Sequence, residues 1–132
     1  MIEDDHEIFG TEVVEIGELA RVGFFKVSDI FFVDIFKPKK NYEVPRFHTK
    51  QGIFTVTLTL SDVKEGLPSL TALDGGRLIN LKNVDFIEET PYGPIVHFLD
   101  TDYTTQMAQR KLKYFRHLVK KEPKIRRNFK EI

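Results

Sequence analysis

The chain has 132 residues, of which 41% are hydrophobic and twelve are Phe, so it suits one domain with a modest core and is too apolar to be disordered. It contains no cysteine, which excludes a disulfide framework and a thiol-based metal or redox site. It also lacks an apolar run long enough for a membrane span and a signal-peptide pattern, so we expect a soluble, intracellular protein.

The net charge of zero conceals an asymmetry along the chain. Residues 1–20 carry seven acids and no base, whereas residues 103–132 carry ten Lys or Arg against two Glu. We expect an acidic N-terminal segment over residues 1–20 and a basic tail over residues 123–132. The near-neutral pI therefore does not exclude a surface that binds nucleic acid, although both ends could simply be solvated.

The first half of the chain predicts strands rich in Val, Ile and Phe, whereas the first ten residues show no periodicity. Strands are expected within residues 12–16, 20–37, 42–49 and 52–60. Residues 37–41, with three Lys around a Pro, predict an exposed loop.

The second half begins with a short helix that Ser61 can cap and that Gly66 and Pro68 end. A tight reversal is expected at Gly75–Gly76, and the strand that follows changes phase near Lys82–Asn83, which predicts an irregularity. Further strands are expected over residues 77–89, 94–100 and 103–109, before an amphipathic helix over residues 110–121 that Pro123 ends. The sequence thus predicts a mainly β domain over residues 21–122, with a short central helix and a C-terminal helix.

No catalytic or metal-binding motif is present. The four His residues are scattered, and the HExxH, GxSxG and glycine-rich phosphate-binding patterns are missing. His97, within an apolar strand, is interpreted as structural. We therefore expect no enzyme activity, no cofactor and no bound metal.

Three segments carry the Lys, Arg, Asn or Gln side chains that phosphates and base edges select. They are residues 37–41, 74–80 and 106–113. On one edge of a sheet they would form a basic rim rich in hydrogen-bond donors, and otherwise they are ordinary solvated loops.

Four stretches follow one another in an order that resembles the LytTR DNA-binding domain of bacterial response regulators. They are DIFFVDIF, FHTKQGIFTVTLTLSDVKEGLPSL, LDGGRLINLKNVDFIEE and IVHFLDTDYTTQMAQRKLKYF. They contain a T-x-x-G turn, a step into a short helix at Thr59, Leu60 and Val63, a hydrophobic-hydrophobic-Asn strand, and an Arg before the last helix. The resemblance covers about residues 24–115. It implies an elongated, multi-sheet β domain whose loops enter successive major grooves.

The resemblance also implies which residues contact double-stranded DNA. The loop after the first apolar strand supplies Lys37, Lys39, Lys40 and Asn41, and the end of the last strand supplies Arg110, with Lys111 and Lys113 facing phosphates. Asn80 matches the family's Asn and is interpreted as structural.

The sequence departs from the family before that Asn. The usual R-x-H-R/N-S-Y/F residues are replaced by the segment from Ala72 to Arg77. Asp74 there repels phosphate unless it is paired, and Arg77 is the residue expected to replace part of the missing contacts.

The resemblance implies a bacterial, cytoplasmic transcription regulator that acts as a homodimer on repeated half-sites. The receiver domain that is usual in the family is not expected in this chain. The alternative is an interaction module that keeps the fold, has lost DNA reading and pairs with another regulator. The departure between Ala72 and Arg77 favours the module, whereas the lysine loop, Arg110 and the basic C-terminal region favour DNA binding.

Overall fold

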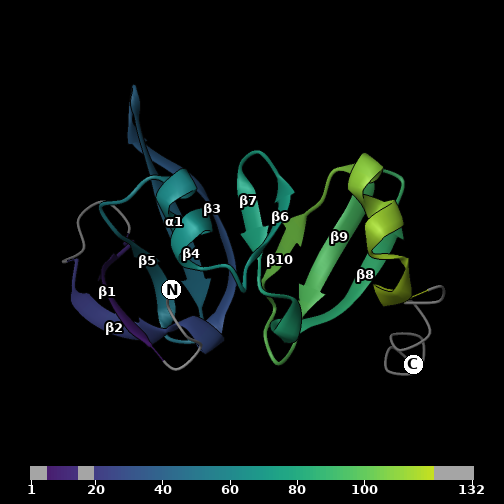
Figure 1. The fold of residues 1–132 in the computed structure, drawn as a ribbon, viewed down its shortest axis with the longest axis horizontal. Helices are drawn as coiled ribbons and strands as arrows, with labels where there is room; N and C mark the ends of the chain where they lie inside the picture. Colours follow the sequence, from purple (N-terminus) through teal and green to yellow (C-terminus); the bar gives the residue numbers. More distant parts are fainter. Residues whose placement is uncertain (1–5, 15–19, 121–132) are drawn as a thin grey trace. The chain divides into compact units, whose positions relative to one another are not determined.

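The computed structural model describes residues 6–14 and 20–120, except for the side chain of Lys39. The chain divides into two compact units, Met1–Asn83 (unit 1) and Val84–Ile132 (unit 2), each with its own β-sheet (Figure 1). The prediction of a mainly β fold is confirmed. The expected basic tail over residues 123–132 and its Pro123 lie outside the described residues.

Unit 1 contains a seven-stranded sheet in the order β2-β1-β5-β4-β3-β7-β6. Its elements are β1 (Glu7–Glu12), β2 (Val22–Lys26), the 3-10 turn η1 (Val27–Asp29), β3 (Ile30–Lys39), β4 (Tyr42–Thr49), β5 (Gly52–Thr55), α1 (Leu60–Gly66), β6 (Thr71–Asp74), β7 (Arg77–Ile79) and the 3-10 turn η2 (Leu81–Asn83). All strand pairs within this sheet are antiparallel.

The core of unit 1 lies between the sheet and α1 together with the segment that follows α1. It consists of Phe25, Val27, Ile30, Val33, Phe47, Phe54, Val63, Leu67, Leu70 and Leu78. The ring of Phe25 packs 5.2 Å from those of Phe47 and Phe54, measured between centroids. Neighbouring strands therefore present their aromatic side chains to one shared core.

The β3–β4 hairpin is longer than the sequence predicts. In place of a loop over residues 37–41, the strands stay paired as far as Lys39 and Tyr42, and only Lys40 and Asn41 form the turn. Asn41 has φ of 62°, a left-handed conformation that Asn tolerates better than most residues. The hairpin extends beyond the rest of its sheet (Figure 1).

Pro38 does not break β3 because of its place in the sheet. Pro lacks an N–H, but the pairing with β4 is irregular between Phe36 and Lys39. The strand on the other side, β7, pairs with β3 only at Phe32 and Val33. The outer part of β3 therefore needs no donor at Pro38.

The start of α1 also differs from the prediction. Its N-cap is Thr59 and not Ser61. The Asp62 N–H donates to Thr59 Oγ1 over 3.0 Å, and the Thr59 N–H donates to the Asp62 carboxylate over 3.1 Å. This capping box fixes the helix start at Leu60, so β5 ends at Thr55 instead of continuing to residue 60.

Two strands of unit 1 are missed by the sequence reading. The first is β1, whose Gly10 approaches β5 so closely that a Cβ would lie 2.9 Å from the backbone oxygen of Thr55. The second is β6, which pairs with β7 across the turn at Gly75–Gly76. That turn was predicted, but neither glycine has a positive φ.

The alternation of apolar residues changes phase after β7, where the chain passes from one sheet to the other. At η2 the chain leaves the first sheet, and β8 begins the second. The Asn83 amide donates to the carbonyl oxygens of Ser28 (2.9 Å) and Ile30 (2.8 Å), so this turn is fixed to the start of β3. The predicted irregularity is confirmed, as a 3-10 turn and not a bulge.

Unit 2 contains a four-stranded sheet in the order β10-β9-β8-β11. Its elements are β8 (Val84–Thr90), β9 (Gly93–Phe98), β10 (Thr104–Gln106), the 3-10 segments η3 (Gln109–Tyr114) and η4 (Arg116–Leu118), and β11 (Val119–Lys120), which runs parallel to β8.

The predicted C-terminal helix is present within the described residues, but as two 3-10 segments and not as one continuous helix. The chain forms η3 and η4 and then joins the sheet as β11. Leu112, Phe115 and Leu118 are three residues apart, which suits the three-residue turn of a 3-10 helix as well as an α-helix. Ala108 provides no side-chain cap at the start of this segment. Leu112 and Phe115 are buried.

A polar cluster joins β3 and β4 at the base of the protruding hairpin. Arg46 donates to both carboxylate oxygens of Asp34, over 2.9 and 2.8 Å. His48 Nε2 lies 3.0 Å from the same carboxylate, and its ring stacks on Phe32. Burial alone would raise the pKa of Asp34, but the hydrogen bonds from His48 and Arg46 outweigh it and lower the pKa from 3.8 to about 2.

We expect Asp34→Asn to lower the free energy of unfolding by about 1–2 kcal/mol at neutral pH. A carboxylate whose pKa is lower in the folded chain than in the unfolded chain stabilises the fold. Asp34 is partly screened by solvent, which reduces the size of this effect. This stabilisation is present above pH 4 and is lost as the pH falls towards 2. Urea unfolding should therefore show a difference between wild type and variant that shrinks over this interval. An equal difference at pH 7 and pH 2.5 would contradict the assignment.

Candidate nucleic-acid interface

The tip of the β3–β4 hairpin carries the first group of predicted contact residues. Lys40 and Asn41 form the turn, and both are exposed. Lys37 is also exposed, and its Nζ lies 3.2 Å from a carboxylate oxygen of Glu43 on the opposite strand. Lys39 is the last residue of β3. The hairpin therefore presents a charged, polar end away from the sheet.

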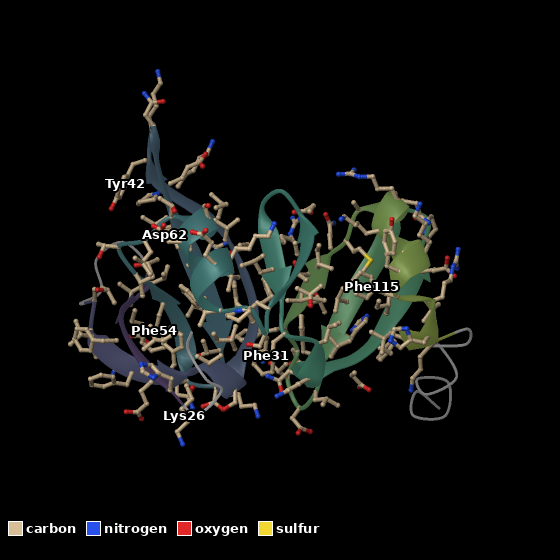
Figure 2. The ribbon with its side chains drawn as sticks, in the orientation of Figure 1. Lys26, Phe31, Tyr42, Phe54, Asp62 and Phe115 are labelled. Carbon is tan, nitrogen blue, oxygen red and sulfur yellow. The ribbon has the colours of Figure 1, made fainter. Side chains whose placement is uncertain are left out.

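The base of this hairpin is aromatic. The guanidinium of Arg46 lies 5.3 Å from the centroid of the Phe36 ring. An open hollow of about 340 Å³ lies beside it, with no charged residue in its lining, which includes Phe9, Phe36 and Tyr42. Figure 2 labels Tyr42, which begins β4 directly after the turn. Phe36 and the Arg46–Asp34 ion pair thus lie below the cationic tip, at the base of the hairpin.

The β6–β7 turn places Arg77 against Asp74. Asp74 accepts the Gly76 N–H over 2.8 Å and pairs with the Arg77 guanidinium over 2.9 Å. The turn therefore carries no net charge, and the expected repulsion between Asp74 and phosphate is offset by Arg77. A Cβ on Gly76 would lie 3.8 Å from Ile35, so this turn lies on the side of β3 that leads to the hairpin tip.

The segment η3 carries the third group. Arg110 and Lys113 are exposed and Lys111 is half-buried. The ammonium groups of Lys111 and Lys113 lie 5.9 and 5.2 Å from the centroid of the Tyr114 ring. Tyr114 is 63% exposed, and the sequence reading missed it. A signal was present, because an aromatic residue beside alternating Lys is a common composition for nucleic-acid contacts.

The structure groups these residues by unit. The hairpin tip and Arg77 belong to unit 1, whereas Arg110, Lys111 and Lys113 belong to unit 2. Of the two alternatives, the one in which all three segments share the edge of one sheet is therefore excluded, because the chain changes sheet between Arg77 and Arg110.

Two further predictions concern structural side chains. Asn80 is buried and its Oδ1 accepts the Lys82 N–H over 3.3 Å, as expected for a structural Asn. His97 lies 2.8 Å from Glu88 and stacks on Phe86 at 4.4 Å between centroids, so its contacts are those of a packed strand residue.

Two other features, metal-binding clusters and membrane-spanning helices, are absent from the described part of the chain. Over residues 6–14 and 20–120, three or more His, Cys, Asp or Glu side chains never gather as a metal ion would require. Within the same ranges, no helix has the length and apolarity needed to cross a bilayer.

Comparisons with known proteins identify a family and a similar fold. The family model described as LytTr DNA-binding domain matches residues 20–120. Among solved structures, the LytTr DNA-binding domain of a methyl-accepting/DNA response regulator from Bacillus cereus is similar in fold, with a TM-score of 0.59 and 15% identity, over 83% of this chain and 94% of that one. No curated protein matches significantly.

We expect Arg77→Ala to weaken duplex DNA binding only mildly, by roughly 1 kcal/mol or less, because Arg77 is already paired with Asp74. Fluorescence anisotropy with a labelled duplex measures the change. The double variant Asp74→Ala/Arg77→Ala, which removes both charges, should bind about as tightly as wild type. A loss of several kcal/mol with altered sequence preference would instead make Arg77 a base-reading residue.

Proposed function

The chain belongs to the LytTR DNA-binding domain family, and from this premise we propose that it is a bacterial transcription regulator that inserts its loops into the major groove of duplex DNA. Membership places it in a family of DNA-binding regulators and not of enzymes. We also propose which residues contact the major groove, that the protein is cytoplasmic, and that it binds repeated half-sites as a homodimer.

The observation that carries this proposal is the β3–β4 hairpin, a narrow two-stranded projection with cationic residues at its tip. A two-stranded ribbon fits the major groove of B-DNA, which is about 12 Å wide. Lys37, Lys39 and Lys40 supply charge for phosphates, and Asn41 supplies an amide that can pair with adenine. The left-handed backbone of Asn41 places this amide at the turn itself.

The segment η3 supports the same proposal from unit 2. It gathers Arg110, Lys111 and Lys113 within four residues, and no acid occurs between Asp102 and Glu122. We propose that Lys111 and Lys113 contact phosphates and that Arg110 reads a guanine by two hydrogen bonds.

We propose that residues 21–122 carry the DNA-binding activity, between an acidic segment over residues 1–20 and a basic tail over residues 123–132. Strand β1 lies within this acidic segment and pairs with β2 and β5.

We expect DNA affinity to fall steeply with salt. If about four of the six cations on the hairpin and η3 contact phosphates, log K against log[salt] should have a slope of roughly −3.6. The cations are Lys37, Lys39, Lys40, Arg110, Lys111 and Lys113. A slope near zero would contradict the electrostatic part of the proposal.

A matched pair of variants locates these contacts on unit 1. Lys40→Ala should make the slope less negative by about 0.9, the effect of one phosphate contact. Lys50→Ala should leave the slope unchanged, because Lys50 lies at the β4–β5 turn, at the other end of β4. Equal effects of the two variants would remove the hairpin tip from the interface.

Arg110→Ala distinguishes a contact to a base from a contact to phosphate. We expect it to weaken binding to the region upstream of the chain's own gene by about 1–3 kcal/mol while sparing binding to random duplex. Its thermal midpoint should hardly change, because an exposed charge contributes little to folding. The control is Arg116→Ala, an exposed arginine of unit 2 that is paired with Glu89.

Equal losses on specific and random DNA would make Arg110 a phosphate contact only. No loss on either, in a folded protein, would contradict DNA reading and favour the interaction module.

A further inference from the structure

Strand β2 forms one edge of the seven-stranded sheet, and among the described residues no strand pairs with its outer side. It is bonded to β1 in an antiparallel register that matches Thr11 with Val22 and Phe9 with Phe24. Free edges of this kind bind further strands unless a Pro, a bulge or a charge protects them. The sequence of β2, VGFFK, has no Pro and only its final Lys26 is charged.

The hydrogen bonds to β1 fix which backbone groups face outward. Glu12 N–H donates to the Arg21 oxygen over 2.7 Å, and Val27 N–H donates to the His6 oxygen over 3.1 Å. Residues of an antiparallel pair alternate between bonded and non-bonded positions. The N–H and C=O groups of Val22, Phe24 and Lys26 therefore point away from β1.

The side chains on the same part of the sheet are apolar and exposed. Phe9 is 54% exposed, Val22 63% and Phe24 57%. The Phe9 and Phe24 rings contact each other, with centroids 5.0 Å apart. They lie on the face opposite the core, because the intervening Phe25 is buried. A second strand that paired at this open edge would place its own side chains beside this apolar face and extend it.

We propose that β2 pairs antiparallel with β2 of a second copy of this chain, about a two-fold axis at Phe24. In this register Val22 lies opposite Lys26 of the second copy, and the outward N–H groups of Val22, Phe24 and Lys26 donate to the three outward carbonyls of the other strand. The two Phe24 rings become neighbours, so the Phe9–Phe24 contact extends across the axis. Val22 covers the aliphatic part of the opposite Lys26.

The charges around the edge are compatible with this pairing. Arg21 is bonded to Glu12 of its own chain over 3.0 Å, and Lys26 lies opposite Glu7. In the two-fold register Lys26 faces Val22, so no like charges are placed opposite each other. Figure 2 shows Lys26 at the outer surface of unit 1. The edge is therefore complementary to itself in hydrogen bonds and apolar contacts, and its charges do not oppose the pairing.

This pairing does not depend on DNA binding, and it adds a surface to the homodimer proposed above. It joins two short strands, so it is smaller than most stable interfaces, and self-association should have a dissociation constant on the order of 100 μM.

Sedimentation velocity without DNA tests the pairing. We expect the wild-type sedimentation coefficient to rise from low micromolar to several hundred micromolar protein. Phe24→Lys should weaken association at least tenfold, because it places two Lys side chains beside each other at the axis. Tyr92→Lys, which changes a 94% exposed aromatic residue of unit 2, is the control and should associate like wild type. A wild type that stays monomeric, or a Phe24→Lys variant that associates as strongly, would overturn the proposal.

Cross-linking tests the register. Because the chain has no cysteine, Phe24→Cys introduces a single thiol. A short bifunctional thiol reagent should link this variant into dimers far more efficiently than Tyr92→Cys. Equal cross-linking would contradict the two-fold axis at Phe24. The affinity of Phe24→Lys and of wild type for a single DNA half-site is then compared. Equal affinities show that the change at β2 removes strand pairing without affecting DNA binding.

Discussion

The pairing of β3 with β4 is the interaction on which the rest of unit 1 depends. These strands occupy the middle of the sheet, with β5 and β7 on their two sides, and they contribute Val33 and Phe47 to the core. At the point where the hairpin leaves the sheet, Asp34 binds both Arg46 and His48 across the two strands. The same pairing therefore contributes to the core and carries the cationic tip, so we expect a change at Asp34 to affect both folding and the hairpin.

Much of the fold could be predicted from the sequence, because alternating apolar residues and turn residues mark most strands. The errors occur where tertiary contacts override local pattern. Strand β1 is acidic and contains Gly10, and only its pairing with β2 and β5 reveals why a glycine stands there. The segment from Leu112 to Leu118 has apolar residues at a spacing that fits both an α-helix and a 3-10 helix, and only the structure distinguishes them. The Thr59–Asp62 capping box was readable from the sequence but was missed.

The candidate site could be predicted in part. Its residues were found through their chemistry and the family resemblance, and Lys37, Lys40, Asn41, Arg110 and Lys113 are exposed. The sequence could not show that Asp74 neutralises Arg77, because hydrogen bonding at the turn determines that pair. It also could not show that the predicted contacts are divided between two sheets, since the division depends on η2 and on Asn83. Tyr114 stands beside Lys111 and Lys113 in the sequence, but its exposure and the position of both ammonium groups near its ring emerged only from the structure.

The central claim is that the turn between β3 and β4 and the segment η3 are the parts of this chain that touch DNA. The most direct measurement is a titration of ¹⁵N-labelled protein with a short duplex, followed by backbone amide chemical shifts. The account predicts that the largest changes occur at Lys40 and Asn41 and across residues 110–113, while the β4–β5 turn at Lys50 and strand β2 change little. Changes concentrated in β2 or at Lys50, with the hairpin tip and η3 unaffected, would contradict it.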